Sequence, residues 1–222
     1  MKSMISKIDH SLKRLYHLDF DYRAEDFLLT QPYSTGTAVG SNAQTEFRGA
    51  LYLVTKSPDD LDLGIYLNAS VRDVLTELNP RTARRWTFRQ LRAFTIATEE
   101  ISHFLYVLKN SLQGRAVSQL ELEIQAEVDK FVILYFAQVG GIFPNDARKI
   151  YDRLFARCFE QFGFAEGLSD EARERYRTAN AVAKRFLLRL GPGLTDRKSC
   201  EFTLRLLRRF YALSCAEKIS AA

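Results

Sequence analysis

The sequence predicts an α-dominated α+β fold, with a β-hairpin or small antiparallel sheet packed on two central helices, followed by a C-terminal helical subdomain. Three observations predict this class. Apolar residues recur at helical spacing over most of the 222 residues. Only residues 46–67 hold two β-preferring runs separated by a turn, and glycine and proline residues divide the last third into helical segments. We assign residues 1–142 to the core and 143–222 to the subdomain, packed together as one globular unit.

The first part of the chain is expected to form a helix and then the hairpin. Residues 3–17 place apolar side chains three and four positions apart, which predicts a short opening helix. Residues 50–54 and 63–67 are rich in β-preferring side chains, and the Ser57-Pro-Asp-Asp60 turn between them predicts a hairpin. Ser70 is expected to cap the helix that follows.

Two long helices form the centre of the predicted fold. The first begins near Thr87, ends at Gly114 and carries apolar residues around most of its surface, as buried helices do. The second is predicted over residues 119–139, because Ser118-Gln-Leu-Glu121 has the form of a capping box and a glycine pair follows the helix. Because the connection between them is short, we expect the two helices to pack antiparallel.

Three helices are predicted in the C-terminal subdomain. The first starts at Pro144, the second is capped by Ser169 and the third is capped by Thr195. Gly191-Pro-Gly193 is expected to close the second helix before the third begins.

Composition limits the class of protein. Hydrophobic residues make up 46% of the chain and charged residues 27%, as in ordinary globular proteins. The longest apolar stretches are far shorter than the roughly 20 residues that a membrane-spanning helix needs, so we expect no membrane insertion. The N-terminus lacks the continuous apolar segment of a secretory signal, which predicts a cytoplasmic protein. The three cysteines are widely spaced and predict neither a disulfide framework nor a cysteine zinc site.

Polar residues interrupt the apolar pattern of both central helices. Glu99, Glu100 and His103 are the only charged or imidazole side chains in a strongly apolar run. Glu99 and His103 are four residues apart and lie on the same side of the helix, whereas Glu100 points partly away. On the second helix Glu127 falls in the middle of the apolar face, where a carboxylate needs an ion pair, hydrogen bonds or a metal. Glu123 lies one turn earlier, at the edge of that face.

The antiparallel packing predicts that glutamates of the second helix lie within reach of His103. Two carboxylates and one imidazole suit zinc, iron or manganese. The predicted ligands of a divalent cation are Glu99, His103, Glu123 and Glu127. Glu100 is the predicted catalytic residue, which would activate a metal-bound water. Asp129, on the second helix, is expected to face solvent.

The order of these elements resembles the small zinc metallopeptidases of the minimal gluzincin type, over about residues 45–139. Those proteins carry an H-E-x-x-H helix and a downstream glutamate ligand. In this chain Glu99-Glu100-Ile-Ser-His103 stands in place of H-E-x-x-H, so the motif is degenerate. The resemblance implies a zincin-like core in which Glu100 matches the general base, His103 the second histidine ligand and Glu123 or Glu127 the downstream glutamate. Glu99 stands where the first histidine ligand belongs.

Three interpretations of this cluster follow. In the first, its side chains form a buried polar network that ties the two helices together. In the second, they bind a metal in a metal-dependent hydrolase or peptidase. In the third, a zincin-like core has lost its chemistry and serves as a binding or regulatory module. We expect a cytoplasmic binding or regulatory protein without peptidase activity, with the hydrolase as the alternative, and the sequence leaves open whether the chain is an enzyme.

The basic charge of the chain is concentrated near its C-terminus. Residues 171–209 hold 11 Lys and Arg against four Asp and Glu, whereas the whole chain carries a net charge of only +5. A nucleic-acid-associated protein is therefore a second alternative, because clustered basic side chains attract phosphate. Interleaved acidic residues favour a solvated face instead, so the partner we expect is another protein or a second copy of the chain.

Overall fold

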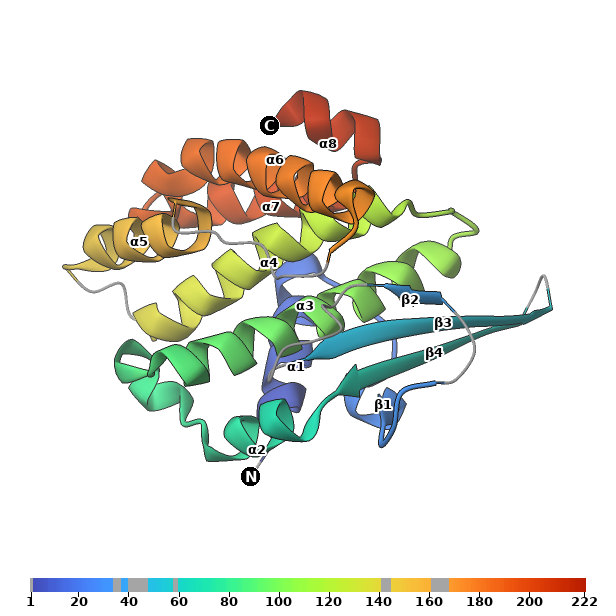
Figure 1. Cartoon of the computed structure of the whole chain (residues 1–222). Helices are drawn as coiled ribbons and strands as arrows, with labels where there is room; N and C mark the ends of the chain where they lie inside the picture. The colour runs from blue at the N-terminus through green and yellow to red at the C-terminus, as the bar shows by residue number, and fades with distance from the viewer. Residues whose placement is uncertain (1, 34–36, 40–47, 58–59, 141–144, 161–167) are drawn as a thin grey trace.

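The computed structural model describes residues 2–33, 37–39, 48–57, 60–140, 145–160 and 168–222. It is an α-dominated α+β protein, as the sequence predicts. Helix α3 runs through the centre, with the sheet on one side and helices α4 to α7 on the other (Figure 1). The elements in chain order are α1 (Met4–Tyr16), the 3-10 turn η1 (Ala24–Phe27), β1 (Leu28–Leu29), β2 (Thr37–Val39), β3 (Gly49–Ser57), β4 (Asp60–Leu67), α2 (Ala69–Glu77), the 3-10 turn η2 (Pro80–Arg85), α3 (Phe88–Ser111), α4 (Gln119–Val139), α5 (Ala147–Phe155), the π-helical turn η3 (Ala156–Glu160), α6 (Asp170–Thr195), α7 (Cys200–Ala212) and α8 (Cys215–Ala221).

The predicted hairpin is confirmed as β3 and β4, within a four-stranded sheet of order β1-β4-β3-β2. The two strands pair antiparallel, with Leu51 opposite Ile65, and both of these side chains are fully buried. Strand β1 pairs parallel with β4, so the sheet is mixed rather than purely antiparallel. Strands β1 and β2 are two and three residues long, too short for an alternating pattern to predict them. The tip of the hairpin turn, residues 58–59, lies outside the described residues.

The central helices begin where their capping residues predict, with one correction nearby. Thr87 accepts from the Gln90 backbone N–H and the Gln90 side chain accepts in return, while Ser118 caps α4. Helix α2, however, is capped by Asn68 and not by Ser70. The Asn68 side-chain oxygen accepts from the backbone N–H of Val71 at 3.2 Å, so the helix starts two residues earlier than predicted.

The C-terminal third differs from the prediction in where its helices begin and end. Helix α5 starts at Ala147, while Pro144 lies outside the described residues. Helix α7 starts at Cys200 rather than after a Thr195 cap, and α8 is an additional helix. Four α-helices therefore occupy this part of the chain among the described residues, where three were predicted.

Helix α6 continues through Gly191-Pro-Gly193, where it was predicted to end. Proline cannot donate a hydrogen bond inside a helix, so tertiary contacts must hold the last turn. The Tyr151 hydroxyl donates to the Leu187 carbonyl at 2.6 Å, and the Tyr135 hydroxyl donates to the Leu194 carbonyl at 3.1 Å. A Cβ atom at Gly191 would lie 2.9 Å from the Tyr151 ring, so glycine is needed at this contact. Packing against α4 and α5 therefore overrides the local signal.

Helix α4 is buried on nearly all sides, because α3, α6 and α1 pack around it. Asp129, predicted to face solvent, is buried and accepts hydrogen bonds from Ser102 Oγ at 2.6 Å and from the Tyr16 hydroxyl. Gln125 Nε2 donates to the same carboxylate at 2.9 Å, and its oxygen accepts from Lys218 Nζ at 2.7 Å. This chain of hydrogen bonds joins α1, α3, α4 and the last helix, α8. The helical spacing of apolar residues in the sequence does not predict these hydrogen bonds, because elements distant in the chain cover this face of α4.

Among the described residues no helix is long and apolar enough to cross a membrane.

The substitution Lys218→Met tests the tie to α8. Burial lowers the pKa of Lys218 to about 7, against 10.5 for an ordinary lysine. Between these two values the unfolded chain binds a proton that the folded protein does not, so the contribution of Lys218 to stability rises with pH. We expect the free energy of unfolding of wild type, minus that of the variant, to increase by on the order of 1 kcal/mol per pH unit between about pH 7 and 10.

Urea unfolding at a series of pH values measures this difference. Subtracting the free energy of unfolding of the variant from that of wild type cancels the contributions of the titratable groups that both proteins share. A difference that stays constant over this range would show that Lys218 keeps its proton when buried.

Candidate metal centre

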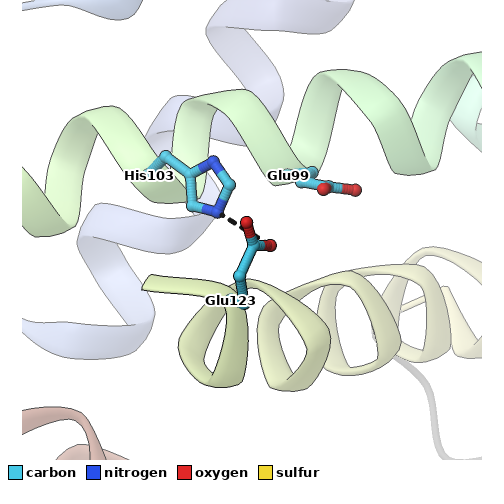
Figure 2. A group of neighbouring side chains, drawn as sticks. All are labelled: Glu99, His103 and Glu123. Atoms are coloured by element: carbon cyan, nitrogen blue, oxygen red, sulfur yellow. Dashed lines mark ion pairs between the residues drawn. The ribbon is translucent and has the colours of Figure 1, made fainter. Parts of the chain in front are cut away.

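Helix α3 brings three polar side chains into the interior. Glu100 and His103 are fully buried and Glu99 is half-buried, in an otherwise apolar stretch. Because Glu99 and His103 are four residues apart, they lie one above the other on the same face of α3. Figure 2 shows the His103 ring directed toward α4, with Glu99 one turn away along α3.

Helix α4 contributes Glu123, which faces His103 across the interhelical space (Figure 2). The His103 Nε2 atom lies 3.7 Å from Glu123 Oε2, and its Nδ1 atom lies 3.6 Å from Glu100 Oε2. One ligand atom each from Glu99, His103 and Glu123 lie within 4.8 Å of one another. The structure therefore brings together three of the four predicted ligands.

Four buried polar atoms in this cluster have no hydrogen-bond partner among the described residues. They are Glu100 Oε2, Glu123 Oε1 and both ring nitrogens of His103. Buried polar atoms of folded proteins are nearly always satisfied by protein, water or an ion. The ion pairs of His103 with Glu100 and Glu123, at 3.6 and 3.7 Å, are too long to be hydrogen bonds, and a water or a cation at this point would satisfy these atoms.

The protonation equilibria of the cluster are strongly perturbed. Burial lowers the pKa of His103, but the carboxylates of Glu100 and Glu123 outweigh it and raise the pKa to about 10. Burial raises the pKa of Glu100 to about 7, against the opposing effect of His103. In the metal-free protein the imidazole is therefore held as a cation between two carboxyl groups, and a metal would replace its proton.

The fourth predicted ligand, Glu127, is engaged elsewhere. Lys130 Nζ lies 2.7 Å from Glu127 Oε1 and 2.9 Å from Glu99 Oε2, so one ammonium group bridges the two carboxylates. Since Lys130 contacts Oε2 of Glu99, Oε1 is the oxygen of this carboxylate that is left for a metal. The sequence analysis overlooked Lys130, although its position three residues after Glu127 on a helix is a signal for an ion pair.

Two neighbours that the sequence analysis also overlooked enclose the cluster. Gly49, the first residue of β3, has no side chain, and a Cβ atom there would lie 2.7 Å from Glu100 Cγ. Tyr176 approaches from α6: burial raises the pKa of its hydroxyl, and the charges of Glu123 and Glu99 raise it further. The sheet and α6 thus close the space around α3 and α4.

The donor set suits a divalent cation. Zinc lies about 2.0–2.2 Å from imidazole nitrogen and carboxylate oxygen in tetrahedral geometry, so two ligand atoms on one ion are about 3.3–3.6 Å apart. Side-chain movements on the order of 1 Å would bring the three ligand atoms to that spacing from the present 4.8 Å limit. Two carboxylates and one imidazole also suit iron and manganese.

The charges of the cluster favour the same conclusion. Four carboxylates, those of Glu99, Glu100, Glu123 and Glu127, face one ammonium group and one imidazole. With all four carboxylates ionised, the cluster carries more negative than positive charge even when His103 is protonated. A divalent cation in place of the imidazole proton adds one positive charge at this point.

Comparisons of the chain with protein-family models, with curated proteins and with solved structures give no match. The resemblance to minimal gluzincins therefore stays a prediction, and the site must be judged on its geometry.

Lys130→Met is expected to destabilise the protein by about 3–5 kcal/mol, because it leaves the carboxylates of Glu99 and Glu127 buried without their shared cation. Arg148→Met is a matched control, since Arg148 pairs with Asp152 on the exposed surface of α5. We expect that control to change stability little. Urea denaturation of both variants measures the difference, and equal effects would contradict a buried bridge at Lys130.

Proposed function

We propose that this chain is a metal-binding protein of binding or regulatory function, in which Glu99, His103 and Glu123 hold a divalent cation between α3 and α4. The observation that carries the proposal is the group of buried polar atoms of His103, Glu100 and Glu123 that lack hydrogen-bond partners, next to three ligand atoms within 4.8 Å. Such a group is costly to bury unless an ion or water satisfies it. The metal would join the two central helices.

In this proposal the two nitrogens of His103 have different roles. Nε2 faces Glu123 and is the ligand, while Nδ1 faces Glu100. Metal-bound histidines usually donate their other N–H to a carboxylate, which fixes the ring and raises its basicity. Glu100 then orients His103 and does not act on a metal-bound water.

This assignment is the reason for preferring a binding or regulatory role over a peptidase. A peptidase of the minimal gluzincin type would need Glu100 to face the open position of the metal. Here Glu100 lies against Nδ1 and under Gly49, and a carboxylate, Glu99, replaces a histidine ligand. A partner protein or a second copy of the chain is the proposed binding partner, and the cytoplasm the proposed compartment.

A metal-dependent hydrolase is the second candidate, favoured by one observation. The pKa of Glu100 is raised to about 7 by burial, close to what a general base needs near neutral pH. The two candidates assign different roles to Glu100 and can be separated by changing it.

Elemental analysis tests the ligand set. Protein purified without a metal-affinity tag is expected to hold about one equivalent of zinc, iron or manganese, and His103→Ala and Glu123→Gln to hold none. Glu127→Gln and His10→Ala are matched controls: Glu127 pairs with Lys130, and His10 is exposed on α1. Both controls should keep the metal.

Circular dichroism must show that each variant folds. If folded Glu123→Gln binds metal and Glu127→Gln does not, Glu127 is the ligand and Glu123 is not. Wild-type protein without metal, even after incubation with each of the three cations, would overturn the proposal.

Glu100→Gln separates the two candidate functions. If Glu100 orients His103, the substitution should weaken metal affinity by about 10–100-fold. If Glu100 is a general base, the variant should keep its metal affinity while losing hydrolase activity that the wild type shows. Isothermal titration with zinc and an assay on a mixed peptide library measure the two properties.

A further inference from the structure

A second cavity lies away from the metal centre, between α1, α4 and α7. Its volume is about 590 Å³, and it is partly open at the surface. Clefts of roughly 300–1,000 Å³ are typical of sites for small organic ligands. None of the proposed metal ligands lines it, so the inference that follows does not depend on the proposed function.

One wall of the cavity is apolar and aromatic. Trp86 precedes α3, Phe94 belongs to α3, Ile133 and Phe136 belong to α4, and Leu204 comes from α7. Trp86 and Phe94 are in mutual contact, with ring centroids 4.9 Å apart, so these two rings form one aromatic part of the lining. A ligand that buries apolar surface against these side chains would gain binding free energy from the hydrophobic effect.

Basic side chains also line the cavity. Lys7, His10 and Arg14 follow one another at three- and four-residue spacing along α1, so they share one face of that helix, and Arg208 reaches in from α7. Among the described residues that line the cavity, none is acidic. The side chains of Lys7 and Arg14 make no hydrogen bond or ion pair within the described part of the chain. Arg208 is held in place, because its Nε donates to the Leu15 carbonyl at 2.8 Å.

We propose that this cavity binds a small anionic amphiphile of the fatty-acid class, with its acyl chain on the aromatic wall and its carboxylate beside Arg14 and Lys7. The apolar wall accounts for the acyl chain, and the side chains of Lys7 and Arg14, which have no acidic partner among the described residues, account for the charge. Arg208, by contrast, already pairs with Glu201 at 3.4 Å. A concave cavity of this size fits one acyl chain, whereas a stable protein contact needs about 800 Å² of surface from each partner.

The experiment is a fluorescence titration of the full-length protein with octanoate, decanoate and dodecanoate. Trp86 is the single tryptophan of the chain and lines the cavity, so its emission reports occupancy directly. We expect saturable binding below the micelle-forming concentration, about fourfold tighter for each methylene that enters the cavity. Decanol, which lacks the charge, should bind at least about tenfold more weakly than decanoate.

Three variants locate the site. Arg14→Glu should weaken decanoate binding at least about tenfold and leave decanol binding unchanged. Arg185→Glu is the matched control, since Arg185 is an exposed arginine on α6 that does not line the cavity. Ala137→Phe, which adds a ring to the α4 wall, should abolish binding of both ligands, and thermal melting must show that it folds.

Each outcome bears on the proposal. Saturable binding with these variant effects supports it. Absence of a fluorescence change, or decanoate affinity equal in wild type and Arg14→Glu, would overturn it. If light scattering shows a wild-type dimer that Ala137→Phe converts to a monomer, the occupant is a second copy of the chain and the fatty-acid proposal is wrong.

Discussion

At the contact between α3 and α4, ionisable side chains occupy positions that apolar side chains such as leucine occupy in most packed helix pairs. Four carboxylates, a lysine and a histidine lie between or beside these helices, and all of them are buried or half-buried. Buried charges are tolerated only when each has a partner of opposite sign or a hydrogen bond. The remaining elements are arranged around this requirement, because they must shield the charges without separating them from one another.

Several local features satisfy this need to pair and shield the buried charges. Lys130 joins Glu99 to Glu127, which leaves Glu123 as the carboxylate that faces His103. The sheet approaches Glu100 through Gly49, where any side chain would collide with the carboxylate stem. On the far side of α4 a separate chain of hydrogen bonds runs from Tyr16 through Asp129 to Lys218. Polar networks on both sides of one helix fix its rotation and register in a way that apolar contacts alone do not.

The same two helices also contribute to the second cavity, but through different faces. Phe94 of α3 and Ile133 of α4 line that cavity, whereas Glu99, His103 and Glu123 point into the metal centre. The two candidate sites therefore use chemically opposite surfaces of a shared scaffold. One is a small, charged, buried point suited to a cation, and the other is a wide apolar hollow with a basic rim suited to an organic anion.

The sequence by itself determined the elements that have strong local signals. The reciprocal cap at Thr87, the serine cap at Ser118 and the β-preferring runs of the hairpin depend on neighbouring residues, so short-range chemistry determines them. The polar residues that interrupt the apolar pattern also marked Glu99, His103 and the two candidate glutamates before any fold was known.

Only the tertiary structure decided which of these residues meet. A helical period states which side chains share a face, but not which neighbouring element covers that face. For this reason Glu123 rather than Glu127 faces His103, and Asp129 is buried under α1 and α8 instead of exposed. Helix α6 likewise passes through Pro192, because contacts with Tyr151 and Tyr135 outweigh the lost backbone hydrogen bond. Local sequence determines which segments form helices, and the packing of residues distant in the chain determines which side chains of those helices contact one another.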